Sequence, residues 1–289
     1  RRERWDPPDG DFIDVDWLAT PEAAGAPLVV LFHGLEGSSA SHYAAALMQA
    51  LARRGWGGAV PHFRGCSGEP NRLPRAYHSG DSAEIDWILQ RLRSLFPQRT
   101  LYAAGVSLGG NALLKWAGEQ QGTARDVVQA LAAVCAPLDL TAAGQALQQG
   151  FSLVYAKRFL VTLKANSRAK LARFPGLFDE RRMLAAKTLY DFDDAVTAPV
   201  HGFRDAADYW RRASSKPWLG GVRLPALVLN ALNDPFLPRQ ALPGPQQVSA
   251  SVRLEYPEAG GHVGFVSGAF PGHLGWLPQR LLDFFDSQR

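Results

Sequence analysis

Two patterns of apolar positions alternate along the first half of the chain. Continuous apolar runs rich in β-branched residues are typical of strands buried on both faces of a parallel sheet. Such runs lie at residues 28–32, 56–63, 100–106 and 127–136. Between them, apolar residues recur at helical spacing, most clearly over 81–96, where one face carries Ile85, Ile88, Leu89, Leu92, Leu95 and Phe96. Strands that alternate with helices predict an α/β fold, with a mostly parallel central sheet flanked by helices.

Further signals extend this sheet in both directions. Residues 12–18 alternate between apolar and polar side chains, which predicts an antiparallel edge strand. Asp81 followed by Glu84 indicates a capping box at the start of the helix 81–96. The other predicted elements are a helix at 40–53, strands at 224–232 and 252–256, and a closing helix at 278–286 with Leu281, Leu282 and Phe285 facing inward.

The pattern changes between residues 137 and 222. No strand is evident there, and helical stretches are broken at Gly150, Pro175 and Pro199. A single crossover helix needs only roughly 12 to 20 residues, and this segment is several times longer. It therefore predicts a helical cap, or lid, at 137–222, inserted late in the sheet of an α/β core formed by residues 1–136 and 223–289.

The composition narrows the class of protein. The 289 residues are 46% hydrophobic and 20% charged, which is ordinary for a globular protein. No apolar stretch approaches the ~18 residues that a membrane-spanning helix needs. The two cysteines, Cys66 and Cys135, are too few for a disulfide framework. They fit a reducing compartment, and we expect a cytoplasmic protein.

The net charge of +4 is unevenly distributed. Residues 151–187 hold nine Lys or Arg residues against two acidic ones, a local charge of +7. No basic stripe with interleaved stacking aromatics occurs, so a nucleic-acid partner is not expected. The favoured interpretation is the solvated outer faces of amphipathic helices. The alternative is a basic, partly apolar lid that makes peripheral contact with anionic lipid surfaces.

A Gly-Val-Ser-Leu-Gly motif at 105–109 joins an apolar strand to a helix-compatible segment. This arrangement is a nucleophile elbow, a strained turn that holds the serine hydroxyl out over the strand ends. The following helix aims free N–H groups and a partial positive charge at an anion forming beside that hydroxyl. We therefore predict that Ser107 is a catalytic nucleophile.

A serine nucleophile needs a base, and the base needs an orienting acid. Asp234 directly follows the predicted strand 224–232, and His262 follows the strand 252–256 through a glycine-rich loop. Both stand at strand ends, as Ser107 does, in the chain order Ser, Asp, His. We predict Asp234 and His262 as the other triad members. The weaker candidates are His33, expected to brace a neighbouring loop, together with His42, His62, His78, His201, His273, Asp193, Asp194 and Asp205.

An oxyanion hole needs two backbone N–H donors. One is expected from Leu108, the residue after the nucleophile, and the other from Leu35, in the loop after the strand 28–32. Glu36 lies beside this hole, and its sequence position suggests no role. The chain has no phosphate-binding Gly-x-x-x-x-Gly-Lys loop, no His-Glu-x-x-His and no Cys-x-x-Cys, so neither a cofactor nor a metal is expected.

The chain resembles the α/β-hydrolase superfamily and, within it, the YheT-like branch, which includes bacterial YheT and the yeast medium-chain ethyl ester synthase/esterases. The resemblance spans nearly the whole chain. The stretches that carry it are HGLEGSSASHY at 33–43, FRGCSGEPN at 63–71, YHSGD at 77–81, GVSLGGN at 105–111, FDDAVTAPVHGF at 192–203, NDPF at 233–236 and GGHVG at 260–264. It implies an α/β-hydrolase fold, a triad of Ser107, Asp234 and His262, and hydrolysis of esters that often carry medium-length acyl groups.

These observations predict a serine carboxylic ester hydrolase that acts through an acyl-enzyme on short- to medium-chain esters. Two alternatives stay open: transfer of the acyl group to an alcohol at the same site, and a non-catalytic binding module with this fold. Aromatic cap residues either line an acyl groove or simply pack the cap. The candidates for the groove are Phe151, Tyr155, Phe159 and Phe178, with Leu153 and Phe174 beside them.

Overall fold

An eight-stranded sheet, in the order β1-β2-β4-β3-β5-β6-β7-β8, forms the centre of the molecule. The computed structural model describes residues 1–19 and 25–289. The strands are β1 (Arg2–Trp5), β2 (Ile13–Trp17), β3 (Leu28–Phe32), β4 (Gly57–Pro61), β5 (Leu101–Val106), β6 (Ala130–Val134), β7 (Ala226–Leu229) and β8 (Val252–Glu255). From β4 through β3 to β8, every neighbouring pair is parallel. The predicted fold class is confirmed.

The antiparallel end of the sheet differs from the prediction. β2 pairs with β4 on one side and with β1 on the other, so the predicted edge strand 12–18 is not at the edge. Strand β1 has no apolar pattern in the sequence, because only Trp5 of its four residues is buried. Its arginines pair instead across the strands, since Arg2 binds Asp16 and Arg4 binds Asp14 at 2.8 Å each. Charge pairing therefore replaces apolar alternation as the signal for this strand.

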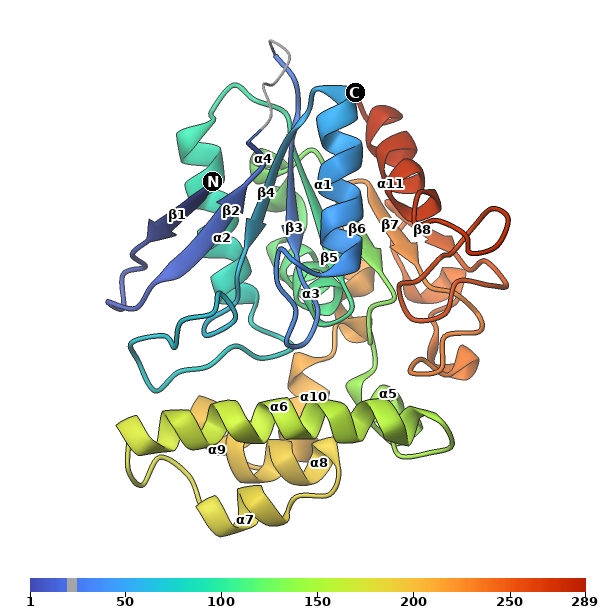
Figure 1. Cartoon of the computed structure of the whole chain (residues 1–289). Coiled ribbons are helices and arrows are strands. Elements are labelled where there is room, and N and C mark those ends of the chain that lie inside the picture. The colour runs from blue at the N-terminus through green and yellow to red at the C-terminus, as the bar shows by residue number, and fades with distance from the viewer. Residues whose placement is uncertain (20–24) are drawn as a thin grey trace.

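Helices cover both faces of the sheet (Figure 1). Successive residues of β3 point to opposite faces, so Val30 and Phe32 join one apolar core while Val29 and Leu31 join the other. The first core packs against α2 (Ser82–Leu95), α3 (Leu108–Gln120) and α4 (Ala124–Val127). The second packs against α1 (His42–Arg54) and α11 (Trp276–Asp286), where Leu281, Leu282 and Phe285 are buried as predicted.

Helix α2 departs from the prediction at both ends. Asp81 caps it by accepting a hydrogen bond from the N–H of Glu84. The predicted capping box is incomplete, however, because the buried Glu84 carboxylate pairs with Arg64 and does not return to the cap. At the other end, Leu95 is 48% exposed and does not belong to the buried face. Glu84, which the sequence pattern assigned to the helix cap, instead forms a buried ion pair with Arg64.

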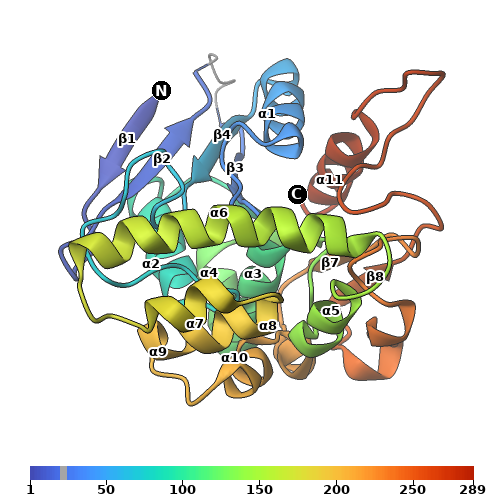
Figure 2. The ribbon, with the colours of Figure 1, turned by 60° about the horizontal axis from the view of Figure 1, so that its bottom comes forward.

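The segment 137–222, which we call the cap segment, lies between β6 and β7 along the chain. Its helices lie across the carboxyl ends of the strands, and α6 runs along most of this side of the sheet (Figures 1 and 2). They are α5 (Leu140–Ala146), α6 (Ser152–Arg173), α7 (Glu180–Ala185), α8 (Leu189–Phe192), the π-helical turn η2 (Asp193–Thr197), α9 (Ala198–His201), α10 (Ala206–Ala213) and η3 (Lys216–Gly221). The division of the chain into a core and a cap domain stays a prediction. Among the described residues, no helix is both long and apolar enough to cross a membrane.

Candidate active site

The turn between β5 and α3 holds Ser107 in a strained conformation, with φ 50° and ψ −120°. Small residues on either side make this turn feasible. A Cβ added at Gly105 would lie 2.6 Å from the carbonyl oxygen of Gly109, and one at Gly109 would lie 2.5 Å from those of Phe32 and His33. The helix can therefore start directly against the strands, and the serine stands at their carboxyl ends.

The structure brings the three predicted triad side chains together. Nε2 of His262 lies 3.1 Å from Oγ of Ser107, and Nδ1 of His262 lies 2.8 Å from Oδ2 of Asp234. The carboxyl of Asp234 is buried, and its other oxygen accepts a hydrogen bond from the N–H of Phe236 at 2.9 Å. In this arrangement, Asp234 holds the imidazole so that its far nitrogen faces the hydroxyl.

The loop that carries His262 is fixed from two sides. Oδ1 of Asn233 accepts hydrogen bonds from the N–H groups of Gly260 and Gly261, at 3.0 and 2.8 Å. The ring of Phe236 packs against the imidazole at a centroid distance of 4.4 Å. Because Asn233 and Phe236 flank Asp234 in the sequence, one short segment after β7 positions both the acid and the base.

The loop after β3 lies directly against the nucleophile. A Cβ added at Gly34 would lie 3.2 Å from that of Ser107, and the N–H of Gly34 donates to the Tyr43 hydroxyl at 2.8 Å. Among the described residues, no protein acceptor takes a hydrogen bond from the N–H of Leu35 or Leu108. Two free donors close to the serine are what an oxyanion hole needs.

His33 braces this loop, as its sequence position suggested. Nδ1 lies 2.8 Å from the carbonyl oxygen of Gly34, and Nε2 accepts a hydrogen bond from the N–H of Phe63 at 3.0 Å. Complete burial lowers the pKa of His33 to about 4. The neutral ring therefore ties the end of β3 to the end of β4 and takes no part in proton transfer.

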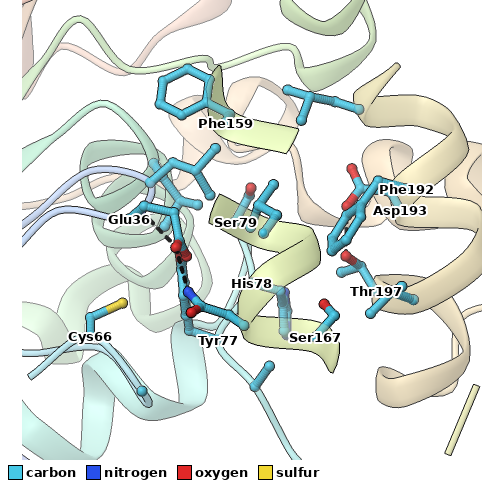
Figure 3. A pocket seen from close by; sticks show the side chains of 18 of the residues that line it. Glu36, Cys66, Tyr77, His78, Ser79, Phe159, Ser167, Phe192, Asp193 and Thr197 are labelled. Carbon is cyan, nitrogen blue, oxygen red and sulfur yellow. Dashed lines mark hydrogen bonds between the residues drawn. The ribbon is translucent and has the colours of Figure 1, made fainter. Parts of the chain in front are cut away.

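A cavity of about 380 Å³ opens beside Ser107 and extends beneath the cap segment. Its size is within the range of small-molecule sites. Its polar lining residues include Glu36 and Tyr77 from the core and Asn166, Asp193 and Thr197 from the cap segment. Its apolar lining residues come mainly from the cap segment, and they include Leu140, Leu147, Phe159, Leu163, Phe192 and Val196. Figure 3 shows Phe159 and Phe192 on the cap side of this cavity, with Glu36 and Tyr77 on the side of the core.

Of the predicted groove residues, only Phe159 lines this cavity. Phe151 is 71% exposed at the start of α6, so its placement in a groove is corrected. Tyr155 packs on Phe236, one layer away from His262. Phe178 belongs to the cap segment's own core, with Met183 among its neighbours. The structure thus divides these aromatics between the two interpretations, because successive turns of α6 face different surroundings and Phe178 lies beyond that helix.

Sequence reasoning missed several polar residues that hold the site together. The buried amide of Asn111 donates to the carbonyl groups of Ser79 and Ala213 and accepts from the N–H of Ser215. The sequence feature that could have indicated Asn111 is its position at the end of the elbow motif 105–111. The hydroxyl of Tyr77 and the amide of Asn166 both contact Glu36. Asn166 carried no signal, because its partner is distant in the chain.

One group of three side chains in the described part of the chain could approach a metal ion. Ligand atoms of Cys135, Asp234 and His262 lie within 4.8 Å of one another. Two of these residues already bond to each other as predicted triad members, and burial raises the pKa of the Cys135 thiol. The geometry therefore favours a hydrogen-bonded triad, and the expectation of a metal-free site stays a prediction.

Comparison with known proteins agrees with this fold. Residues 27–269 match the model of the family described as alpha/beta hydrolase fold. The chain belongs to the α/β-hydrolase family. The predicted membership and fold are confirmed, including the YheT-like branch, because the chain is 41% identical to the putative esterase YheT of Escherichia coli over 98% of its own length and 83% of the relative's.

More distant relatives carry related names. The chain is 28% identical to human phospholipase ABHD3 over 96% of its own length and 69% of the relative's. It is 29% identical to medium-chain fatty acid ethyl ester synthase/esterase 2 of Saccharomyces cerevisiae, over 90% and 62%. Among solved structures, Est1E from Butyrivibrio proteoclasticus with bound ferulic acid superposes with a TM-score of 0.63 at 17% identity, covering 99% and 98% of the two chains. At the level of the family, the prediction of an ester hydrolase is confirmed.

Proposed function

We propose that this protein hydrolyses carboxylic esters of short- to medium-chain acids, with Ser107 as the nucleophile, His262 as the base and Asp234 as its orienting acid. The observation that supports this most directly is the hydrogen-bonded chain from Asp234 through His262 to Ser107, with distances of 2.8 and 3.1 Å. The similarity over nearly the whole chain to the putative esterase YheT of Escherichia coli supports the same class of reaction.

In the first half of the reaction, Oγ of Ser107 attacks the ester carbonyl carbon while Nε2 of His262 takes the hydroxyl proton. The carbonyl oxygen becomes an oxyanion and accepts hydrogen bonds from the N–H groups of Leu35 and Leu108. His262 then gives its proton to the leaving alkoxy oxygen as the C–O bond breaks. The products of this half are a free alcohol and an acyl group bonded to Ser107.

In the second half, His262 takes a proton from water, and the resulting nucleophile attacks the acyl carbon. The second oxyanion collapses, the bond to Ser107 breaks, and the proton returns from His262 to Oγ. The carboxylic acid leaves and the free enzyme is restored. Asp234 stays ionised throughout and stabilises the imidazolium each time it forms.

The acyl chain is assigned to the apolar wall that the cap segment adds to the cavity. Phe159 and Leu163 lie one turn apart on α6, and both line the cavity together with Phe192 of α8. Burying each methylene of an acyl chain there contributes about 0.8 kcal/mol. A volume of about 380 Å³ favours acyl groups of limited length.

The proposal is tested with p-nitrophenyl esters of increasing chain length and with a fluorophosphonate probe, which labels activated serines. We expect hydrolysis and labelling of the native protein, and loss of both in Ser107→Ala. The matched control is Ser287→Ala, which removes a hydroxyl that, among the described residues, bonds only to its near neighbours Phe284 and Gln288. A native protein that neither labels nor hydrolyses any ester in the series would instead support the non-catalytic binding module.

A second candidate is transfer of the acyl group from Ser107 to an alcohol, which would replace water in the second half-reaction. The similarity to a yeast ethyl ester synthase/esterase favours testing it. The substrate is incubated with increasing ethanol, and the products are separated by gas chromatography. Ethyl ester formed in proportion to ethanol, at the expense of free acid, supports transfer, whereas free acid alone supports hydrolysis.

The outer face of α6 supports a further element of this proposal, a peripheral contact with anionic lipid. Phe151 and Val161 are 71% and 70% exposed. The helix carries Lys157, Arg158 and several further cations but no carboxylate. Exposed apolar side chains beside cations are typical of surfaces that enter the headgroup region of a membrane.

This contact is tested by co-sedimentation with vesicles of phosphatidylcholine, with and without phosphatidylglycerol. We expect binding only to the anionic vesicles, weakened by high salt and by the double substitution Phe151→Ser with Val161→Ser. Leu95→Ser serves as the control, because Leu95 is an exposed apolar residue outside the cap segment. Absent binding, or binding that salt leaves unchanged, would remove this part of the proposal.

We also propose a reducing compartment, the cytoplasm, for this protein. Both cysteines are free, and Cys135 is completely buried beside the triad. The assignment is tested by fractionating the source cells and locating the protein with an antibody. Recovery from an oxidising compartment would contradict it.

A further inference from the structure

Glu36, to which the sequence assigned no function, has a backbone conformation that is unusual for its residue type. Its φ is 53°, in the left-handed region that side chains other than glycine and asparagine seldom occupy. It directly follows Leu35, whose N–H is the expected second donor of the oxyanion hole. A strained residue at this point persists only if its surroundings hold it there.

The hydroxyl of Tyr77 holds Glu36 in a closed pair of hydrogen bonds. It accepts from the N–H of Glu36 at 2.9 Å and donates to Oε1 of the same residue at 2.7 Å. The Tyr77 ring is itself fixed, because it stacks on Phe63 with a centroid distance of 5.4 Å and an interplanar angle of 9°. Backbone and side chain of Glu36 are thus tied to one rigid aromatic group.

The remaining carboxylate oxygen of Glu36 connects this loop to the cap segment. Nδ2 of Asn166, on α6, donates to Oε2 at 2.7 Å, across 130 residues of sequence. Asn166 lines the same cavity as Glu36 and Ser107. In Figure 3, dashed lines mark these hydrogen bonds at the Glu36 carboxylate. A displacement of α6 away from the core therefore has to break a hydrogen bond to the residue that follows Leu35.

The charge of Glu36 does not itself suit the chemistry. A carboxylate beside a forming oxyanion opposes it electrostatically. Burial raises the pKa of Glu36, while the hydrogen bonds from Tyr77 and Asn166 act in the opposite direction. A group that is unfavourable by charge, strained in its backbone and held by three hydrogen bonds is best explained by the geometry that it imposes.

We propose that Glu36 is a positioning residue: clamped by Tyr77 and Asn166, it sets the direction of the Leu35 N–H and couples the oxyanion hole to the docked position of α6. The inference rests on the proposed ester hydrolysis at Ser107. The substrate chain would lie between α6 and the core. The hydrogen bond from Asn166 to Glu36, which forms when α6 is docked, would then also fix the oxyanion hole. Binding and oxyanion stabilisation would then be linked through one side chain.

The test compares Glu36→Ala, Glu36→Gln, Tyr77→Phe and Asn166→Ala. The glutamine Oε1 can still accept from Tyr77, and its Nε2 can donate to Oδ1 of Asn166 once that amide is turned over, so Glu36→Gln should restore activity. Phenylalanine keeps the stacking on Phe63 but loses both hydrogen bonds. The controls are Thr162→Ala, one turn earlier on α6, whose hydroxyl bonds only to the carbonyl of Arg158, and Tyr256→Phe, whose hydroxyl bonds only to Pro243.

We expect kcat to fall about tenfold in Asn166→Ala and about ten- to a hundredfold in Tyr77→Phe and Glu36→Ala, with KM changed by less than about threefold. These values lie below the loss for complete removal of an oxyanion donor. An alkyl trifluoromethyl ketone serves as an inhibitor that probes the oxyanion hole. Oγ of Ser107 adds to its carbonyl carbon, and the resulting hemiketal oxyanion occupies the hole. Its inhibition constant should rise in parallel with the fall in kcat. The Glu36→Gln enzyme should be at least as active as the native protein, because glutamine keeps the clamp and removes the opposing charge. Both controls should match the native protein.

Several results would overturn the inference while leaving the proposed function intact. One is a native enzyme that is active, with kcat unchanged in Tyr77→Phe and Asn166→Ala. Another is a set of variants that lose thermal stability but no activity. A third is an inhibition constant of the ketone that is the same in the variants and the native protein. Effects of Tyr77→Phe and Asn166→Ala that are simply additive in the double variant would remove the coupling through Glu36. A native protein that hydrolyses no ester would instead count against the proposed function.

Discussion

Nε2 of His262 lies 3.1 Å from Oγ of Ser107, although 155 residues separate them along the chain. The contact arises because β5 and β8 belong to the parallel part of one sheet, so their carboxyl ends lie on the same side of it. Ser107 reaches this side through a strained turn, and His262 reaches it through a glycine-rich loop held by Asn233. The cap segment lies over these strand ends and supplies much of the lining of the cavity.

The interaction of His262 with Asp234 predicts a graded loss of activity. We expect kcat to fall by about 10⁴ to 10⁶ in His262→Ala and by a smaller factor, up to about 10⁴, in Asp234→Asn. The asparagine keeps the shape of the side chain but favours the wrong imidazole tautomer. Steady-state hydrolysis of a p-nitrophenyl ester measures both. Asp6→Asn, an exposed carboxyl, is the control, and equal losses in Asp6→Asn and Asp234→Asn would contradict the assignment.

The close approach at the elbow predicts that Gly109→Ala is severely damaging. The added Cβ would meet the carbonyl oxygens of Phe32 and His33 at 2.5 Å, and these are backbone atoms that cannot move aside alone. We expect a loss of about 2 kcal/mol or more in the free energy of unfolding, together with at least about a tenfold loss of kcat. Gly122→Ala is the matched control, because its Cβ would have nothing within 4 Å. Equal denaturant midpoints for the two variants would refute the crowding argument.

The position of Phe159 in the cavity wall predicts a change in acyl preference. Phe159→Ala enlarges the apolar end of the cavity, so the chain length with the highest kcat/KM should increase by about two to four carbons. The profile is measured with p-nitrophenyl esters from acetate to palmitate. Phe178→Ala serves as the comparison because Phe178 packs within the cap segment. If both variants shift the profile alike, the effect is one of cap stability.

The buried amide of Asn111 joins α3 to the loop before α2 and to the end of α10. Asn111→Ala leaves the carbonyl groups of Ser79 and Ala213 and the N–H of Ser215 without this partner. Unpaired buried groups of this kind destabilise by about 1–3 kcal/mol each, so for these three groups we expect a loss of at least about 3 kcal/mol. Denaturant unfolding followed by tryptophan fluorescence measures it. A loss below about 0.5 kcal/mol would show that other partners replace the amide.

Asp193 predicts a specific dependence of stability on pH. Burial raises its pKa to about 6 from the ordinary 3.8, although Thr197 and Trp210 donate hydrogen bonds to it. Between these values the folded protein keeps a proton that the unfolded chain has lost. Its contribution to stability is therefore complete below about pH 4 and is lost as the pH rises through about 6.

The measurement is the difference in Tm between the native protein and Asp193→Asn from pH 4 to 7. Asparagine keeps an acceptor for Trp210 and a donor for Thr197 but does not titrate. The variant should gain stability relative to the native protein as the pH rises. A difference that is constant over this interval would show that Asp193 is ionised in the folded state at all these values.

Local patterns in the sequence predicted most of the sheet correctly. The run 28–32 became β3 with every residue buried, since a strand covered on both faces needs apolar side chains at each position. The patterns were less reliable where charge took part. Strand β1 is held by Arg2 and Arg4, and Glu84 joins a buried pair with Arg64, and neither arrangement has a periodic signature.

By itself the sequence determined the fold class, the elbow at Ser107 and the order in which Asp234 and His262 follow it, because strand, turn and helix signals are local and parallel strands share one edge. Only the tertiary structure decided which side of α6 faces the cavity and which faces outward. It placed Phe159 inside, left Phe151 exposed and brought Asn166 to Glu36. These outcomes depend on how a helix docks, and the apolar and polar residues around α6 permit more than one rotation about its axis.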